Sequence, residues 1–256
     1  MKYKSNASWA RIVRQVSLLL LLALFLSNQQ SPQHIPPFIF PELDQPVVSL
    51  WLAATANDSA QTRAQLKEVK RQWQIHKADV EDFPLTVCNP YLIGGTIDAL
   101  LVQMQRAQAV PDYDELTGLS YHFLWEFKTV RAFHRQNYYP LDAWWDVYNL
   151  HQEISFATHD PELGLLEWQE LECMFDEFVC LLEEYEAKAE ANLTRYAPRV
   201  DEDAHKDAMN RIYVCINDYK QALTTGYRDR LLTPCEEIAA GLKLILTCYT
   251  KEGVTL

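Results

Sequence analysis

Apolar residues recur at intervals of three and four from residue 59 onward, the spacing of one face of an α-helix. Short polar or proline-containing connections separate these segments and favour antiparallel neighbours. The sequence therefore predicts an all-α fold, a single domain of about seven mostly antiparallel helices over residues 59–256, following an N-terminal signal segment. The expected helices cover residues 59–75, 96–109, 118–136 and 142–157, about thirty residues after Asp160-Pro161, and two segments that begin near Asp201 and Thr233.

Two of the later helices carry clear start signals. Asp160-Pro161-Glu162 has the order of an N-cap residue, a proline at the first helical position and an acid that suits the helix dipole. Thr233-Pro234-Cys235-Glu236 has the spacing of a capping box. This spacing places Cys235 in the first turn of its helix, where the dipole lowers the pKa of a thiol. A reactive thiol at Cys235 is thus an alternative to a disulfide.

The segment before the first expected helix is rich in proline. Five prolines lie between residues 31 and 46, and proline-rich chain tends to be extended. Residues 31–58 are therefore expected to form an extended spacer, with a short strand at Val47–Leu52 as an alternative for part of it.

The N-terminus has the pattern of an export signal. A basic stretch without acids precedes the leucine-rich run Val16–Leu26, which has about half the length of a stable membrane span. We expect residues 1–30 to be a signal peptide and the protein to be periplasmic or secreted. Because no A-x-A site follows the run directly, an uncleaved anchor through residues 15–28, with the body outside the cytoplasm, is the alternative. Membrane contact is expected through this segment alone. Its basic residues are Lys2, Lys4, Arg11 and Arg14.

Six cysteines suit an oxidising compartment, because an even number permits three disulfides. Two of them, Cys173 and Cys180, lie seven residues apart in a helical pattern, which separates their Cα atoms by about 10 Å. A disulfide requires less than about 7 Å, so each would have to bridge to another element. Buried free thiols are the alternative. The candidates are Cys88, Cys173, Cys180, Cys215, Cys235 and Cys248.

The charge of the chain is strongly negative. The formal net charge of −12 becomes −16 when the four basic residues before Ser27 are removed. A body this acidic is a poor ligand for nucleic acid or for an anionic membrane surface. Residues 160–203 hold 14 acidic residues against Lys188, Arg195 and Arg199. The acidity is therefore concentrated in one stretch of the chain.

Glycine is scarce, with 7 residues in 256, and none of them forms a G-x-G. This excludes a P-loop, a dinucleotide-binding fingerprint and a G-x-S-x-G nucleophile elbow, each of which needs glycines at fixed offsets. No cofactor is expected, and a non-enzymatic protein is favoured.

Aromatic residues are concentrated between Tyr121 and Tyr148, with ten in this stretch. One interpretation is a helical hairpin that forms core. The other is an aromatic-walled pocket for a small apolar ligand, since tyrosine and tryptophan combine an apolar face with a polar tip. The ligand-binding candidates are Trp125, Trp144, Trp145 and Tyr148.

The same hairpin suggests a metal or acid–base site. If the two helices fold back across residues 137–140, Glu126 faces His151, and His122 lies four residues before Glu126 on the same face. Two histidines and a carboxylate are a workable ligand set for a metal or for general acid–base chemistry. A surface His–Glu pair and a histidine at the edge of the core are the alternatives.

The long acidic segment offers a second kind of site. Glu183, Glu184, Glu186 and Glu190 lie close together in it. They indicate either a solvated helix face or a docking surface for a basic protein partner. The motif Glu202-x-x-His205 follows, but a di-iron bundle needs two such pairs, and a second is absent from the sequence.

These observations lead to two functional hypotheses. The first is an exported helical binding protein whose partner is a basic protein or a small apolar ligand, bound through the acidic helix or the aromatic hairpin. The alternative is an exported metal-dependent or acid–base hydrolase that uses His122, Glu126 and His151.

Overall fold

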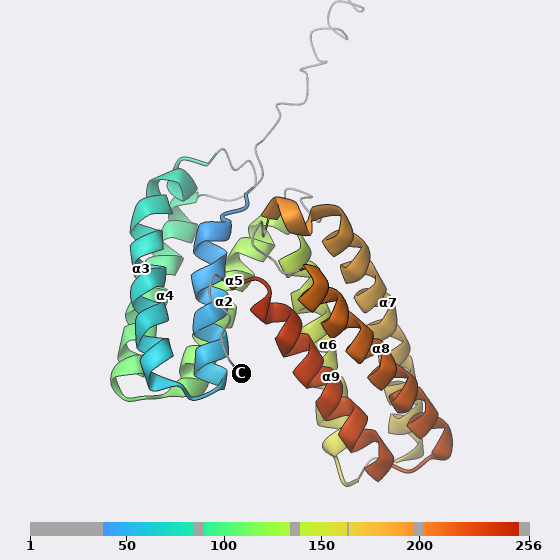
Figure 1. Ribbon diagram of the computed structural model, residues 1–256. Coiled ribbons are helices and arrows are strands. Elements are labelled where there is room, and N and C mark those ends of the chain that lie inside the picture. Colours follow the sequence, from blue (N-terminus) through green and yellow to red (C-terminus); the bar gives the residue numbers. More distant parts are fainter. Residues whose placement is uncertain (1–37, 84–89, 134–138, 163, 197–201, 251–256) are drawn as a thin grey trace, which may run out of the picture. The chain divides into compact units, whose positions relative to one another are not determined.

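The computed structural model describes residues 38–83, 90–133, 139–162, 164–196 and 202–250 (Figure 1). Helices dominate these ranges, and no strand occurs within them. The prediction of an all-α fold is therefore confirmed, with one helix more than expected. The helices are α2 (Pro41–Thr55), α3 (Ser59–Glu81), α4 (Pro90–Ala109), α5 (Tyr113–Phe133), α6 (Pro140–His159), α7 (Leu165–Tyr196), α8 (Glu202–Thr225) and α9 (Asp229–Thr247).

The helices pack in two sets of consecutive neighbours (Figure 1). In the first set α2 lies against α3 and α5, and α4 lies against the same two helices. In the second set α6 packs on α7 and α9, and α8 packs on α9. Contacts of α2 with α9, and side-chain contacts between α5 and α6, join the two sets into one compact unit that begins at residue 37.

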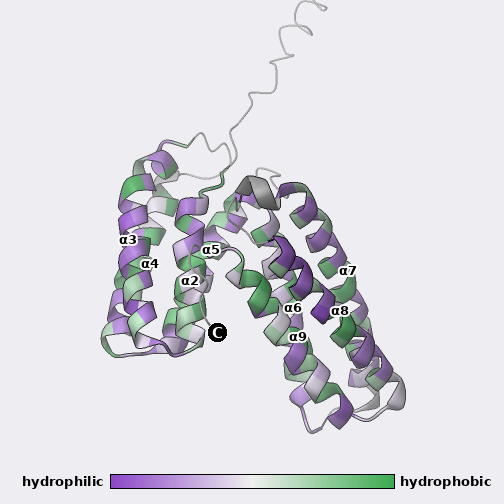
Figure 2. Cartoon of the chain, in the orientation of Figure 1, coloured by the Kyte–Doolittle hydropathy of each residue, from purple (hydrophilic) through white to green (hydrophobic). Residues whose placement is uncertain are grey.

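The additional helix, α2, corrects the prediction of an extended spacer over residues 31–58. Pro41 occupies the start of α2, where its missing N–H is not needed. Pro46 lies inside the helix, yet every residue from Val47 to Ala54 is buried, and this apolar half of the helix forms core. Figure 2 shows the change along α2 from purple to green. Burial of this run favours a helix over the extended chain or strand that the prolines suggest.

Two predicted helix starts are also wrong. The side chain of Asp160 accepts a 2.8 Å hydrogen bond from the backbone N–H of Glu162, but it caps a turn, because α7 begins at Leu165. The last helix begins at Asp229, so Pro234 lies inside it and Cys235 lies in its second turn. Cys235 therefore does not sit at the positive end of the helix dipole.

The expected signal segment lies outside the described residues, and the described cysteines form no disulfide. Residues 1–37, which contain the expected signal or anchor and the start of the spacer, and Cys88 lie outside the described residues. No described helix is long and apolar enough to cross a membrane. No disulfide joins any two of the described cysteines, and Cys173 and Cys180 are exposed free thiols on α7. The expected bridge from this helix is thus absent from the described part of the chain.

A buried cluster of charges joins α2, α5 and α6. Arg131 donates two hydrogen bonds of 2.7 Å to the carboxylate of Asp142, and its Nη1 lies 3.5 Å from Oδ2 of Asp44. The same Nη1 donates a 3.4 Å hydrogen bond to the carbonyl of Phe38, and the guanidinium lies over the ring of Tyr139. All five residues are buried. A charge removed from water is tolerated only when it is paired in this way.

Removing the central charge of this cluster is expected to destabilise the fold strongly. Arg131→Met leaves two buried carboxylates without their cation and should lower the free energy of unfolding by ~3–5 kcal/mol. Arg71→Met, which removes an exposed ion pair with Glu68, is the matched control and should change the free energy of unfolding far less, because water screens that pair. Urea unfolding measures both, and equal losses would contradict this role for Arg131.

Candidate functional site

The aromatic helices α5 and α6 lie side by side, but in a different register from the one expected. Lys128 forms an ion pair with Asp146, and the amide of Asn149 donates a 2.9 Å hydrogen bond to the hydroxyl of Tyr121. These contacts place residues 144–148 opposite Glu126, where the expected register placed residue 151. The two helices meet through long side chains without close packing of their backbones.

Most of the expected ligand-binding aromatics form core. Trp144 and Trp145 are buried, their ring centroids are 4.7 Å apart, and Tyr148 stacks on Trp144 at 5.0 Å. Trp51 of α2 contacts all three rings, and the Nε1 of Trp144 donates a hydrogen bond to the carbonyl of Leu242 in α9. This cluster connects α2, α6 and α9, so the interpretation of these rings as core is the one that the packing supports.

Trp125 differs from the other aromatic candidates because it is 42% exposed. It lines a hollow of about 370 Å³ together with Thr129 and Phe133 on the outer face of α5, and the ammonium of Lys128 lies 4.9 Å from its ring. The structure thus separates Trp125 from Trp144, Trp145 and Tyr148, and the four do not form one pocket.

The expected set of His122, Glu126 and His151 is not assembled. His122 forms an exposed pair with Glu126, with 3.1 Å between Nε2 and Oε1. His151 is buried elsewhere, where its Nε2 donates a 3.1 Å hydrogen bond to the carbonyl of Cys235 and its ring contacts Phe178. No group of three metal-ligating side chains is present among the described residues. The physical reason is the register of α5 and α6, which turns His151 toward α7 and α9.

His151 and Cys235 form a neutral buried pair. The Sγ of Cys235 lies 3.7 Å from Nε2 of His151. Burial lowers the pKa of His151 to about 4 and raises the pKa of Cys235. A reactive cysteine needs the opposite shift, toward the thiolate. The expectation of a dipole-activated thiol at Cys235 is therefore wrong.

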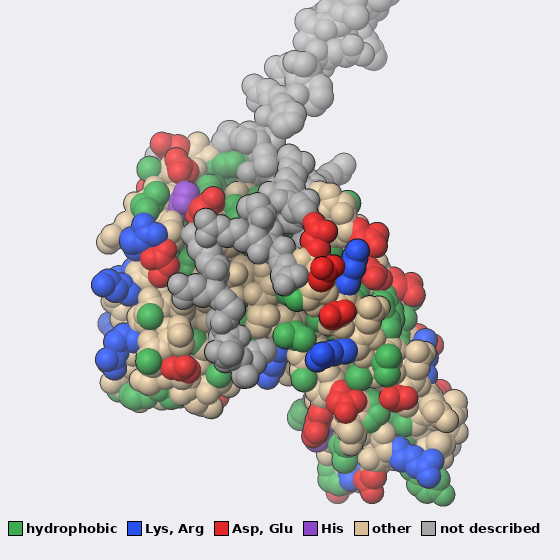
Figure 3. Space-filling model, viewed as in Figure 1, with side chains coloured by type: hydrophobic (Ala, Val, Ile, Leu, Met, Phe, Trp, Pro, Cys, Tyr) green, Lys and Arg blue, Asp and Glu red, His purple; other side chains and the backbone are tan. Residues whose placement is uncertain are grey.

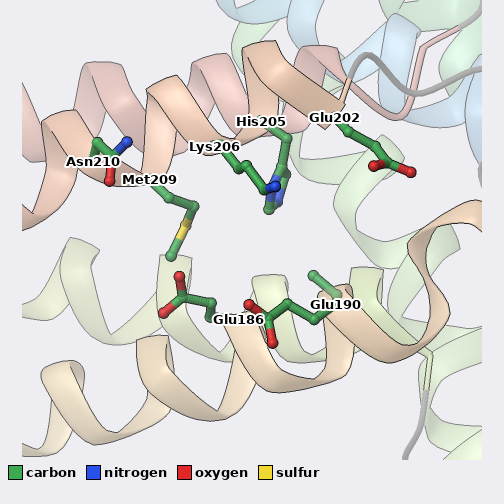
Figure 4. Close-up of a pocket in the computed structure, with 8 residues that line it drawn as sticks. Glu186, Glu190, Glu202, His205, Lys206, Met209 and Asn210 are labelled. Atoms are coloured by element: carbon green, nitrogen blue, oxygen red, sulfur yellow. The ribbon is translucent and has the colours of Figure 1, made fainter.

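A cavity with several charged side chains lies between α7 and α8, and Figure 4 shows these side chains. It has a volume of about 460 Å³. Glu186 and Glu190 extend from α7, one helical turn apart, and face His205 and Lys206 from α8 across the gap. The backbones of α7 and α8 do not pack closely, and the two helices meet through side chains such as Phe175 and Tyr219, whose rings stack at 4.1 Å. We call the cavity the α7/α8 cleft; it is lined by Glu186, Ala189, Glu190, Glu202, His205, Lys206, Met209 and Asn210.

A hydrogen-bonded chain supports the inner wall of the α7/α8 cleft. The Nε2 of His205 lies 2.8 Å from the hydroxyl of Tyr185, which lies 3.3 Å from the hydroxyl of Tyr249. All three residues are buried. Burial lowers the pKa of His205, opposed by the nearby charge of Glu186, and burial raises the pKa values of both tyrosines. At neutral pH these three side chains are therefore uncharged, and their hydrogen bonds hold the ring of His205 in place.

The carboxylates of the α7/α8 cleft have no basic partner among the described residues. Glu186 accepts a 2.6 Å hydrogen bond from the hydroxyl of Tyr213, which fixes its position. No described lysine or arginine forms an ion pair with Glu186, Glu190 or Glu202. Lys206 is the basic residue among those lining the cleft, so the carboxylates exceed the ammonium groups by two. Unbalanced negative charge beside an apolar wall suits a cationic ligand.

Sequence reasoning identified Glu186, Glu190 and the pair of Glu202 and His205, but as separate features. It missed Lys206 and the apolar contribution of Met209, because nothing in the sequence shows which faces of two helices meet. A comparison with known families, curated proteins and solved structures found no significant match to this chain. The assignment of a site therefore rests on the geometry and the charge of the α7/α8 cleft.

The two classes of tryptophan should respond differently to truncation. Trp144→Ala removes a fully buried ring and its hydrogen bond to Leu242, and should cost ~3–5 kcal/mol of unfolding free energy. Trp125→Ala removes a half-exposed ring and should cost less than ~1 kcal/mol. Chemical denaturation measures both, and a small loss for Trp144→Ala would contradict its assignment to the core.

Two buried groups should act on stability in opposite directions as the pH changes. The pKa of His151 falls from 6.5 to about 4 on folding, so the unfolded chain binds this proton more tightly. The free energy of unfolding is therefore unaffected by His151 above pH 6.5 and decreases as the pH falls from 6.5 toward 4. Burial, opposed by the charge of Arg131, raises the pKa of Asp44 from 3.8 to about 6. The folded state therefore binds this proton more tightly, and stability decreases as the pH rises from about 4 to about 6.

Variants separate these two effects. Relative to the unmodified protein, His151→Gln should gain stability as the pH is lowered from 7 to 4.5, because the variant has no imidazole to protonate. Asp44→Asn should gain relative stability as the pH is raised over the same interval. Each change should be on the order of 2 kcal/mol, measured by denaturant unfolding at several pH values. Slopes of the same sign for both variants would contradict the assigned environments.

Proposed function

We propose that this protein is a binding protein whose α7/α8 cleft takes a lysine or arginine side chain of a basic partner protein. The observation that carries this proposal is a set of three carboxylates around one cavity, none of which forms an ion pair with a lysine or arginine in the part of the chain that the structure describes: Glu186, Glu190 and Glu202. An ammonium or guanidinium group provides the donors and the charge that these oxygens lack.

The remaining lining residues fit a long basic side chain. Met209 and Ala189 offer apolar surface along which the methylene stem of a lysine or arginine can pack. His205 closes the inner end of the cleft and is neutral at pH 7, so it does not repel a cation there. The cleft therefore combines an apolar wall for the stem with acidic groups for the charged end.

The charge on the outside of the protein favours the same type of partner. Exposed acids continue along α7, which includes Glu172, Asp176, Glu177 and Glu183. Basic side chains are instead gathered over α3, at the left edge of Figure 3, and they include Arg63, Lys67 and Arg71. An acidic surface around a binding cleft attracts a basic protein over distances of about 10 Å and raises the rate of association.

Of the two functional hypotheses, we keep the helical binding protein, and we assign binding to the acidic helix α7 instead of the aromatic hairpin. The hydrolase alternative has no support from geometry, since His122, Glu126 and His151 do not meet. Export of the protein also remains a proposal, supported by the basic N-terminus and the leucine-rich run Val16–Leu26. The binding chemistry of the cleft does not depend on that location.

A matched pair of double variants tests the proposal in the full chain. Glu190→Gln with Glu202→Gln removes two charges from the α7/α8 cleft and leaves Glu186 with its hydrogen bond from Tyr213. It should weaken binding of a fluorescent lysine-rich peptide at least ~10-fold, which corresponds to about 1.4 kcal/mol. Fluorescence anisotropy measures this affinity, and raising the salt concentration should weaken it.

The control removes the same charge from a distant part of the same helix. Glu172→Gln with Glu177→Gln changes two exposed acids of α7 that do not line the cleft, and should weaken binding less than ~3-fold. Equal losses for the two double variants would show that net charge alone attracts the peptide. That result, or the absence of peptide binding at low salt, would overturn the proposal.

A further inference from the structure

A second hollow lies on the outer side of α8 and α9, and it differs from the α7/α8 cleft in being mainly apolar. It has a volume of about 510 Å³, and we call it the α8/α9 groove. Its floor and walls include Cys215 from α8 and Gly241 and Leu244 from α9. Val214 borders it and projects into solvent with 61% of its surface exposed. The groove thus pairs an apolar hollow with an apolar side chain beside it.

The hollow has a local cause in the packing of the two helices. A Cβ added at Gly241 would lie 2.5 Å from Cγ1 of Ile212, so α8 and α9 approach closely at this point because residue 241 has no side chain. Ala240 next to it is also small. Two small residues in succession on α9 leave the surface recessed beside the projecting side chain of Val214.

The two ends of the α8/α9 groove carry opposite charges. Arg211 lies at one end, four residues before Cys215 on α8, near the level of Leu244. Glu237 lies at the other end, where one of its oxygens accepts a 3.5 Å hydrogen bond from the thiol of Cys215. Neither Arg211 nor Glu237 forms an ion pair with a described residue. The groove therefore presents one cation and one anion that no described residue pairs, about one helical turn apart along its length.

We propose that the α8/α9 groove is the interface of a two-fold symmetric dimer formed with a second copy of this chain. In such an interface residue i contacts residue j of the partner, and j contacts i. A two-fold axis across the groove, perpendicular to the line from Arg211 to Glu237, exchanges the two ends. Arg211 then meets Glu237 of the partner subunit, and Glu237 meets Arg211 of the partner subunit. Val214 packs into the hollow beside Gly241 of the partner subunit.

The charge pattern is what identifies a second copy as the occupant. A cation and an anion placed at opposite ends of one groove are complementary to the same arrangement turned by a two-fold rotation. The apolar hollow and Val214 are complementary in the same way. This dimer uses a surface separate from the α7/α8 cleft, so it does not depend on the proposed binding of a basic partner.

Single charge reversals test the symmetry of this interface directly. A chain with Arg211→Glu has an acid at both ends of the groove, and a chain with Glu237→Arg has a base at both ends. Each variant alone should be monomeric, because like charges meet across the two-fold axis. An equimolar mixture of the two should form a heterodimer, in which every end meets its opposite. Sedimentation velocity of the full chains, with one of the two carrying a fluorescent label, measures each of these states.

A second pair of variants places the same new charge beside the α8/α9 groove and away from it. Val214→Glu should abolish the dimer, whereas Val102→Glu, at an exposed apolar position on α4, should leave it intact. The proposal is contradicted if the unmodified chain is monomeric at every concentration. It is equally contradicted if the two reversed variants, each folded by circular dichroism, fail to associate when mixed.

Discussion

The buried guanidinium of Arg131 is the interaction on which the arrangement of this protein depends. It comes from the last turns of α5, binds Asp142 in the first turn of α6 and lies beside Asp44 in the first turn of α2. A buried cation cannot be left unpaired without a cost of several kcal/mol. The start of α2, the end of α5 and the start of α6 are therefore held at one point. Burial raises the pKa of Asp44, the charge of Arg131 opposes this shift, and the second carboxylate, Asp142, adds to it.

This fixed point has consequences for the helices that follow. The start of α6 is tied to α5, and Trp144 lies between Trp51 of α2 and Leu242 of α9. His151 follows two turns later on the same face of α6, where it contacts α7 and α9. α7 then packs on α6 and α8 packs on α9, whereas α7 and α8 meet through side chains without close packing of their backbones. The gap between them is lined by the acids of α7 and by His205. The α7/α8 cleft is thus a result of how the second set of helices pairs.

The periodic pattern predicted the fold class and seven of the helices, but it could not find α2. Amphipathic periodicity marks a helix with one wet face, whereas Val47–Ala54 is buried on all sides and is preceded by prolines. The same limit applies to the expected metal site. His122 and Glu126 share a face, as their spacing requires, but the position of His151 depends on the register and spacing of α5 and α6. Tertiary contacts such as that of Arg131 in α5 with Asp142 in α6 hold that register, and they have no local signal.

The acidic residues of the α7/α8 cleft and His205 were predictable from the sequence, but their assembly into one site was not. The glutamates of α7 and the pair of Glu202 and His205 each stand out in the sequence through their helical spacing. Their meeting around one cavity depends on which helices pair, and the hydrogen bond from Tyr213 to Glu186 belongs to that tertiary arrangement. Local chemistry can therefore be read from the chain, while its assembly into a site requires the fold.

The histidines offer the most direct measurement of whether the α7/α8 cleft binds a basic side chain. His205 lines the cleft, His122 is exposed on α5, and His151 is buried in the core, so their ring proton resonances report on three environments. During an NMR titration with a lysine-rich peptide, the resonances of His205 and of the Met209 methyl should shift with a common saturation curve, while those of His122 and His151 stay in place. Unchanged His205 resonances at saturating peptide, or equal shifts at His122, would contradict the account.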